Sequence, residues 1–195
     1  MPDETKQPTK KPGGWSPVRQ HLTTWKKPAL LALVKDLYEA AAANRDFIHA
    51  RCHADESGGE SLEQYRQKII RQFFSKSAVG IGPLKLGEAR KAIRDYRKAT
   101  GNHAGTAELL MTYVESGAQF THEYGDIDER FYSSVESALD ELATLLRGEA
   151  RELYPQFSDR LANVEQMTDG IGWGFHDFIA DVVGQLEEEL SSPGE

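Results

Sequence analysis

The chain contains only one cysteine, Cys52, among its 195 residues. A single thiol can form neither an internal disulfide nor a zinc site built from several cysteines. Long apolar runs are also missing. The longest spans residues 29–34, far short of the ~20 residues that a membrane-spanning helix needs. The first residues contain no apolar segment of the signal-peptide type. We therefore expect a cytoplasmic protein without a membrane partner.

Basic side chains are scarce in the second half of the chain, although the whole carries a net charge of only −8. Residues 1–98 contain 19 Lys and Arg against 11 Asp and Glu, a net charge of +8. Residues 99–195 contain 4 Lys and Arg against 20 Asp and Glu, a net charge of −16. The two halves either attract each other within one fold, or each attracts a different partner.

Strand-like alternation of apolar and polar residues is absent, and helical spacing recurs through most of the chain. The composition, 39% hydrophobic and 28% charged, suits a globular protein with a proper core. The sequence predicts an all-α fold, a single compact domain of about seven or eight helices over residues 21–190. Residues 1–20 are polar and contain four prolines, so we expect a disordered basic tail there. Residues 191–195 are expected to be frayed.

Local signals predict where several helices begin and end. Pro28 suits the first turn of a helix, and Ser61 with Gln64 forms a capping box that predicts a helix over 61–74. Gly101 and the following Asn102 predict a helix stop, and Asp128 fits an N-cap. Further helices are predicted at 45–52, 86–99, 106–122, 128–148, 155–167 and 173–190.

The helix predicted at 86–99 carries a stripe of five cations on the side opposite its apolar residues. Like charges one turn apart repel by about 0.2–0.5 kcal/mol per pair, and an anion facing the stripe would relieve that repulsion. The anion could be the acidic half of the chain, a nucleic-acid backbone or a phosphorylated small molecule. No aromatic residue interleaves the stripe, and no recognised nucleic-acid motif is evident. The candidate binding residues are Arg90, Lys91, Arg94, Arg97 and Lys98.

Residues 122–129 crowd acidic side chains and one histidine around Gly125. The spacing fits neither H-E-x-x-H nor an EF-hand loop. Capping of two successive helices explains the segment, and a divalent-metal site is the alternative. The candidate metal ligands are His122, Glu123, Asp126 and Asp128.

Residues 168–177, T-D-G-I-G-W-G-F-H-D, set three glycines around Trp173 before the last helix. No strand is predicted before this glycine turn and no G-K-[ST] follows it, so we predict no nucleotide or other cofactor. Adjacent residues of a helix point in different directions, so His176 and Asp177 form no catalytic dyad. We expect Trp173 to anchor the turn by packing and His176 to be half-buried with its polar atoms satisfied. Trp173 and His176 are the candidate binding residues here.

Four segments together resemble a bacterial family of uncharacterised proteins, classed as a domain of unknown function. The specific part is E-Y-G-D-I-D-E-R-F-Y-S-S-V-E-S-A at 123–138 and D-G-I-G-W-G-F-H-D at 169–177. L-V-K-D-L-Y-E-A at 33–40 and L-K-L-G-E-A-R-K-A-I-R-D-Y-R-K at 84–98 complete it. The resemblance covers roughly residues 22–190. It implies a small, cytosolic, helical bacterial protein, and it implies no activity, substrate or catalytic residue.

No complete catalytic template is present, so the sequence predicts a non-enzymatic binding, interaction or regulatory module with a protein partner or self-association. One alternative is a nucleic-acid or phosphate binder that acts through residues 86–99. Another is a metal-dependent hydrolase built from His122, Glu123, Asp126 and His176. Whether the protein is an enzyme stays open at this level.

Overall fold

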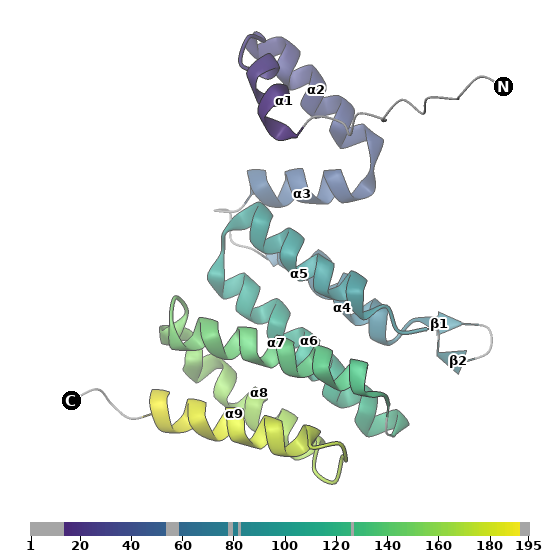
Figure 1. Ribbon diagram of the computed structural model, residues 1–195, viewed down its shortest axis with the longest axis vertical. Helices are drawn as coiled ribbons and strands as arrows, with labels where there is room; N and C mark the ends of the chain where they lie inside the picture. The colour runs from purple at the N-terminus through teal and green to yellow at the C-terminus, as the bar shows by residue number, and fades with distance from the viewer. Residues whose placement is uncertain (1–13, 54–58, 78–79, 82, 126, 192–195) are drawn as a thin grey trace, which may run out of the picture. The chain divides into compact units, whose positions relative to one another are not determined.

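A computed structural model describes residues 14–53, 59–77, 80–81, 83–125 and 127–191 (Figure 1). These residues form nine α-helices, one short 3₁₀-helix and one minimal β-hairpin, so the predicted all-α class is confirmed. Within these ranges no helix is both long and apolar enough to cross a bilayer. Residues 1–13 of the expected tail and residues 192–195 of the expected frayed end lie outside the described residues.

The first elements are α1 (Trp15–Leu22), α2 (Lys27–Ala40), α3 (Ala42–Cys52), α4 (Gly59–Phe73), β1 (Lys76–Ser77) and β2 (Gly80–Ile81). They are followed by α5 (Leu86–Thr100), α6 (His103–Tyr124), α7 (Glu129–Arg147), the 3₁₀-helix Arg151–Leu153, α8 (Tyr154–Met167) and α9 (Phe175–Leu190). The antiparallel pair β1–β2, in which Lys76 faces Ile81 and Ser77 faces Gly80, was not predicted.

The chain divides into two compact units, residues 1–45 and residues 46–195. The first unit contains α1 and α2. Helix α1 begins at Trp15, so helical structure begins earlier in the chain than we predicted. Helix α2 has Pro28 in its first turn, as expected. After α2, the side-chain amide of Asn44 donates to the carbonyl of Leu37 over 2.7 Å.

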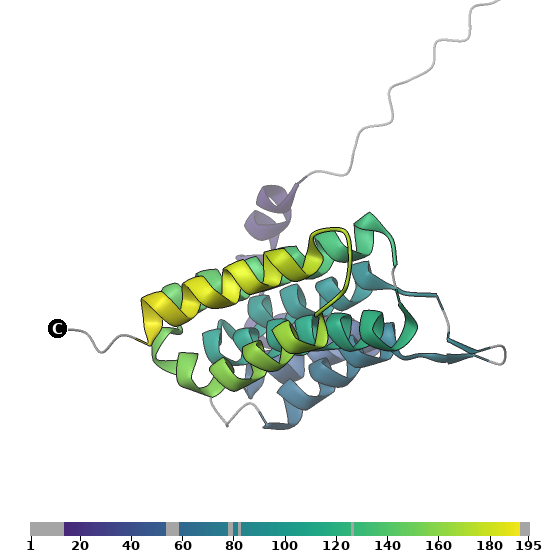
Figure 2. The same ribbon diagram turned by 90° about the horizontal axis from the view of Figure 1, so that it is seen from below.

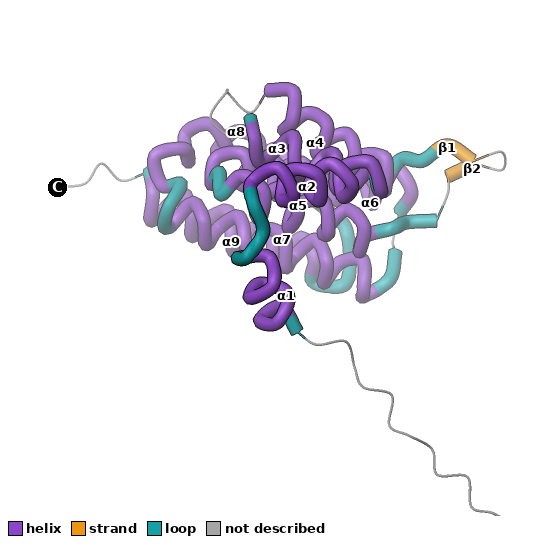
Figure 3. The backbone as a smooth tube through the Cα atoms, turned by 90° about the horizontal axis from the view of Figure 1, so that it is seen from above, coloured by secondary structure: helices purple, strands orange, loops and turns teal. Residues whose placement is uncertain are grey.

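Three helical hairpins stack in sequence order in the second unit: α4 with α5, α6 with α7, and α8 with α9 (Figures 1 and 2). Helix α6 is the central element, because it packs against α4, α5, α7 and α8, and α9 covers α7 and α8. The first helices of the hairpins, α4, α6 and α8, are therefore neighbours. Figure 3 shows that almost all of the described chain is helical.

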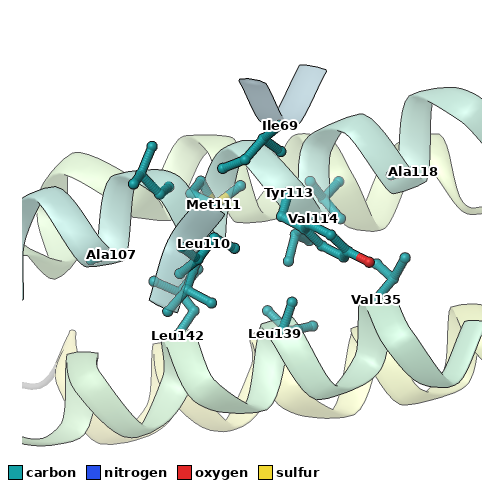
Figure 4. Packing of buried hydrophobic residues seen from close by; sticks show 14 of the residues in the cluster. Ile69, Ala107, Leu110, Met111, Tyr113, Val114, Ala118, Val135, Leu139 and Leu142 are labelled. Atoms are coloured by element: carbon teal, nitrogen blue, oxygen red, sulfur yellow. The ribbon is translucent and has the colours of Figure 1, made fainter. Parts of the chain in front are cut away.

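The core is built around α6, in which 14 of 22 residues are buried. Figure 4 shows Leu110 and Tyr113 of this helix between Ile69 of α4 and Leu139 and Leu142 of α7. Helix α7 buries only one side, which is the amphipathic pattern that the sequence shows. Two buried hydroxyls of this helix are hydrogen-bonded within it: Thr112 donates to the carbonyl of Glu108 and Ser116 donates to the carbonyl of Thr112.

Two of the predicted helix ends are confirmed and one is wrong. The carboxylate of Asp128 accepts from the backbone N–H of Phe131 at 2.9 Å, as an N-cap does. Gly101 ends α5 in the left-handed conformation with φ of +64°. The predicted capping box at Ser61 is wrong, because α4 already begins at Gly59 and Ser61 lies inside the helix.

Candidate functional site

Arg90 is the least exposed of the five predicted cations of α5, with 15% of its side chain accessible. Its guanidinium lies 5.6 Å from the ring centre of Tyr113, and Nη2 donates to the carboxylate of Glu141 on α7. The Nη1 atom is buried and has no hydrogen-bond partner among the described residues. Arg97 Nη1 lies 4.0 Å from the other oxygen of Glu141. These two cations of the basic half are therefore paired inside the fold with an acid of the acidic half.

Arg97 is exposed, and so are the other three predicted cations of α5. Lys91 pairs with Asp95 of its own helix at 2.8 Å. Within the described part of the chain, the side chains of Arg94 and Lys98 form no ion pair. The backbone carbonyl of Lys98 accepts a hydrogen bond from Arg51. The stripe is thus only partly available to an external anion.

The C-terminal end of α6 and the glycine turn before α9 lie at the same end of the hairpin stack (Figures 1 and 2). His122 Nδ1 is 3.1 Å from the carbonyl oxygen of Met167. A carbonyl only accepts, so Nδ1 is the donor in this hydrogen bond. The next residue, Thr168, donates to the carbonyl of Glu165. Its Oγ1 therefore accepts from Nδ1 of His176 at 3.3 Å. The structure thus brings the two predicted histidines to one place through Met167 and Thr168.

Those predicted metal ligands that the structure describes do not assemble around these histidines. Glu123 accepts from the side chain of Gln119 at 2.7 Å, Asp128 caps α7, and Asp126 lies outside the described residues. Among the residues that are described, no group of three His, Cys, Asp or Glu is placed to hold a metal ion. Capping therefore accounts for Asp128.

Trp173 does not anchor the glycine turn, contrary to our expectation. The residue is 69% exposed and its backbone φ is +65°. Two glycines of the same turn also have positive φ, Gly170 at +77° and Gly174 at +72°. The turn is held instead by Phe175, which is fully buried and lies 4.7 Å from Tyr132 between ring centres. A bulky side chain at positive φ is an outlier with a cost of order 1–3 kcal/mol.

Two adjoining openings lie along the first helices of the hairpins, and we call them together the α6 groove. The opening between α6 and α8, of about 710 Å³, is lined by Glu115, Gln119, His122, Asn163, Gln166 and Met167. The second, of about 430 Å³, shares Glu115 and Gln119 with the first and is also lined by Arg66, Ile70, Phe74, Thr112, Ser116 and Arg160. The groove reaches Met167, and the glycine turn begins with the next residue.

An ion-pair network along the groove joins the three hairpins. Arg160 of α8 donates to both oxygens of Glu115 at 2.7 and 2.8 Å, and to Glu108 at 2.8 Å. Arg66 of α4 donates to the other oxygen of Glu108 at 3.2 Å. The hydrogen bonds to Glu115 are the main reason that the pKa of Arg160 lies above its ordinary value, although burial opposes the shift. The positive charge of Arg160 is therefore balanced by the carboxylates of Glu115 and Glu108 on α6.

Apart from His122, the groove residues were not found by the sequence analysis. Gln119, Asn163 and Gln166 lie on exposed faces of amphipathic helices, where side-chain amides are common and carry no motif. Only the stacking of α4, α6 and α8 brings them together. A prediction of stacked hairpins would have directed attention to the first helix of each hairpin.

No family model, no curated protein and no solved structure matches the chain. The resemblance to an uncharacterised bacterial family therefore stays a prediction.

Proposed function

We propose that the protein is a non-enzymatic interaction module that binds an extended segment of a partner protein along the α6 groove, with Trp173 as the anchor. The observation that carries the proposal is the conformation of Trp173. Its positive φ costs free energy, and with 69% of the residue exposed it gains little from packing in return. Burial of the indole against a partner would offset that cost, and Trp is enriched among the residues that dominate interface energies.

The chemistry of the groove suits a polypeptide more than a strongly charged ligand. The amides of Gln119, Asn163 and Gln166 can each donate and accept, as the peptide group does. Met167 supplies a flexible apolar wall. The charge of Arg160 is already balanced by Glu115, so this arginine is not available to bind an anionic ligand. Proteins built from stacked helical hairpins bind peptides on such shared faces, and this is an analogy at the level of the fold.

The alternative functions have less support. Nucleic-acid binding through α5 has to compete with Glu141 for Arg90 and Arg97. The hydrolase lacks a ligand group among the described residues.

The experiment that tests the proposal selects binders from a library of random peptides against the immobilised full-length chain, and then measures their affinities for variants. Trp173→Ala is expected to weaken binding about 30-fold or more, the loss of an anchor worth about 2 kcal/mol. Gln119→Ala is expected to weaken it less. The matched control is Trp15→Ala, because Trp15 is similarly exposed at 66% but belongs to the first unit. Failure to select any peptide, or peptides whose affinity is unchanged by Trp173→Ala, would contradict the proposal.

A comparison of Trp173→Gly with Trp173→Ala checks the strain itself. Gly adopts positive φ without penalty, whereas Ala retains the clash of its Cβ. In urea denaturation we expect the free energy of unfolding to be about 1 kcal/mol higher for Trp173→Gly than for Trp173→Ala. Both variants are expected to lose binding. Equal stability of the two variants would show that the backbone at 173 carries no strain.

A further inference from the structure

Helix α2 presents an apolar face with three exposed aliphatic residues along it. Of residues 14–45, all of which are described, none is buried. Leu31, Val34 and Leu37 expose 58%, 43% and 48% of their surface. At about 100° per residue, the large apolar residues occupy one side of the helix. They are Leu30, Leu31, Leu33, Val34, Leu37 and Tyr38.

The pattern on this face is symmetric about Val34. Leu31 and Leu37 stand three residues to either side of it, and Leu30 and Tyr38 stand four residues to either side. Two such helices laid antiparallel would therefore set Leu31 against Leu37, Leu30 against Tyr38, and Val34 against its own copy. A self-complementary surface is what a two-fold dimer requires.

We propose that the α2 face binds the same face of a second copy of this chain, with the two helices antiparallel and the two-fold axis at Val34. The proposal is independent of the α6 groove and of Trp173.

The charges at the helix ends favour the same arrangement. Helix α2 has no acidic residue in its first turn and no basic residue in its last turn, so its own charges do not compensate its macrodipole. Lys27, at the first position, lies on the apolar side of the helix. In the antiparallel pair Lys27 of each copy reaches the C-terminal carbonyl groups of the other helix, where a cation is stabilising. Charge complementarity therefore operates at both ends of the interface.

The polar side of α2 argues against a lipid surface as the occupant. It carries Lys35, Asp36 and Glu39, and Lys35 lies 3.7 Å from Glu39. Helices that bind anionic membranes through an apolar face usually have a basic polar face. One base and two acids do not meet that description, whereas they suit a helix whose polar side faces water.

The first test is sedimentation equilibrium of the full-length chain over a wide range of protein concentration. We expect a monomer–dimer equilibrium. Val34→Glu places two carboxylates on the axis and is expected to raise the dissociation constant more than about a hundredfold. Lys27→Glu is expected to raise it about 3-fold to 30-fold, since two end contacts are lost. Lys35→Glu, the same charge change on the polar side, is the control and is expected to leave it unchanged.

Circular dichroism separates these effects from loss of the helix. An acid near the N-terminus favours a helix, so Lys27→Glu is expected to keep the helical content while weakening the dimer.

The second test determines the register by disulfide trapping in a Cys52→Ser background, because the exposed Cys52 would otherwise cross-link. A thiol introduced by Val34→Cys meets its own copy and is expected to form a covalent dimer under mild oxidation. One introduced by Asp36→Cys on the polar side is expected not to do so.

Three results would overturn the proposal. The first is a chain that stays monomeric at every concentration. The second is a loss of thermal stability of the monomer on Val34→Glu, which would mean that the face packs within one chain. The third is flotation of the monomer with phosphatidylglycerol vesicles that Val34→Glu abolishes, which would mean that the face binds lipid. None of these results bears on peptide binding at Trp173.

Discussion

Gly117 of α6 lies so close to Val135 of α7 that a Cβ built on the glycine would be only 2.5 Å from Cγ2 of the valine. Real Cβ atoms do not approach other carbons to that distance. The two central helices therefore meet at this glycine with no room for a side chain, and the closeness of the α6–α7 hairpin depends on it.

Gly117→Ala is expected to lower the free energy of unfolding by about 1–3 kcal/mol, since the methyl group forces Val135 or the backbone to move. Denaturant titration followed by circular dichroism measures the change. Gly184→Ala on α9 is the matched control: nothing lies within 4 Å of its Cβ position, so alanine is expected to raise stability by about 0.5–1 kcal/mol. A neutral Gly117→Ala would mean that the hairpin separates at no cost.

Arg160→Met is expected to destabilise the protein by about 1–2 kcal/mol, because it removes the arginine paired with Glu115 and leaves Glu108 with Arg66 alone. The figure is modest because these side chains remain 26–34% exposed to water. Lys91→Met, which breaks the exposed pair with Asp95, is the control and is expected to cost at most about 0.5 kcal/mol. Combining Arg160→Met with Glu115→Gln should restore part of the loss in thermal denaturation. Simple additivity of the two substitutions would show that the pair is not coupled.

Tyr65 is expected to make stability fall at high pH. Burial, with a smaller contribution from Asp46 and Asp95, raises the pKa of Tyr65 to about 12, whereas the pKa in the unfolded chain is about 10. The unfolded state therefore loses its proton first. The contribution of Tyr65 to the free energy of unfolding is fully present below pH 10. It is lost between pH 10 and 12, by at most about 1.4 kcal/mol per pH unit.

Urea denaturation below and above pH 10 measures this effect. Tyr65→Phe should lose less stability across the window than the natural chain does. The buried Tyr96 and Tyr113 also have raised pKa values and act in the same direction, so the two slopes are compared and not their absolute values. Identical slopes would exclude Tyr65 as a source of the pH dependence.

The helix order was predictable because short-range chemistry determines it. Gly101 ends α5 in a conformation that favours glycine, and Asp128 caps α7 with its own carboxylate. These signals act within a few residues and can be recognised in the chain alone. The predicted start of α4 was wrong, because the helix begins at Gly59, two residues before the predicted cap at Ser61.

The candidate site was less predictable, since it depends on contacts between distant segments. Arg90 belongs to the polar side of its helix, and only the packing of α7 reveals that Glu141 covers it. Trp173 was expected to anchor the turn by packing, because the sequence reveals neither its positive φ nor its exposure. The hydrogen bond between His122 and the carbonyl of Met167 joins residues that lie 45 positions apart in the sequence.

The stacking of the hairpins in sequence order has a consequence for how the chain folds during synthesis. Each hairpin packs on the one made before it, so no layer has to wait for a distant strand or a late crossover, and contacts that are local in sequence favour rapid folding. Helix α6 leaves the ribosome after α4 and α5 and finds them already present to cover two of its sides. Translation from the N-terminus thus delivers the layers in the order in which they are needed, and α9 closes the stack last.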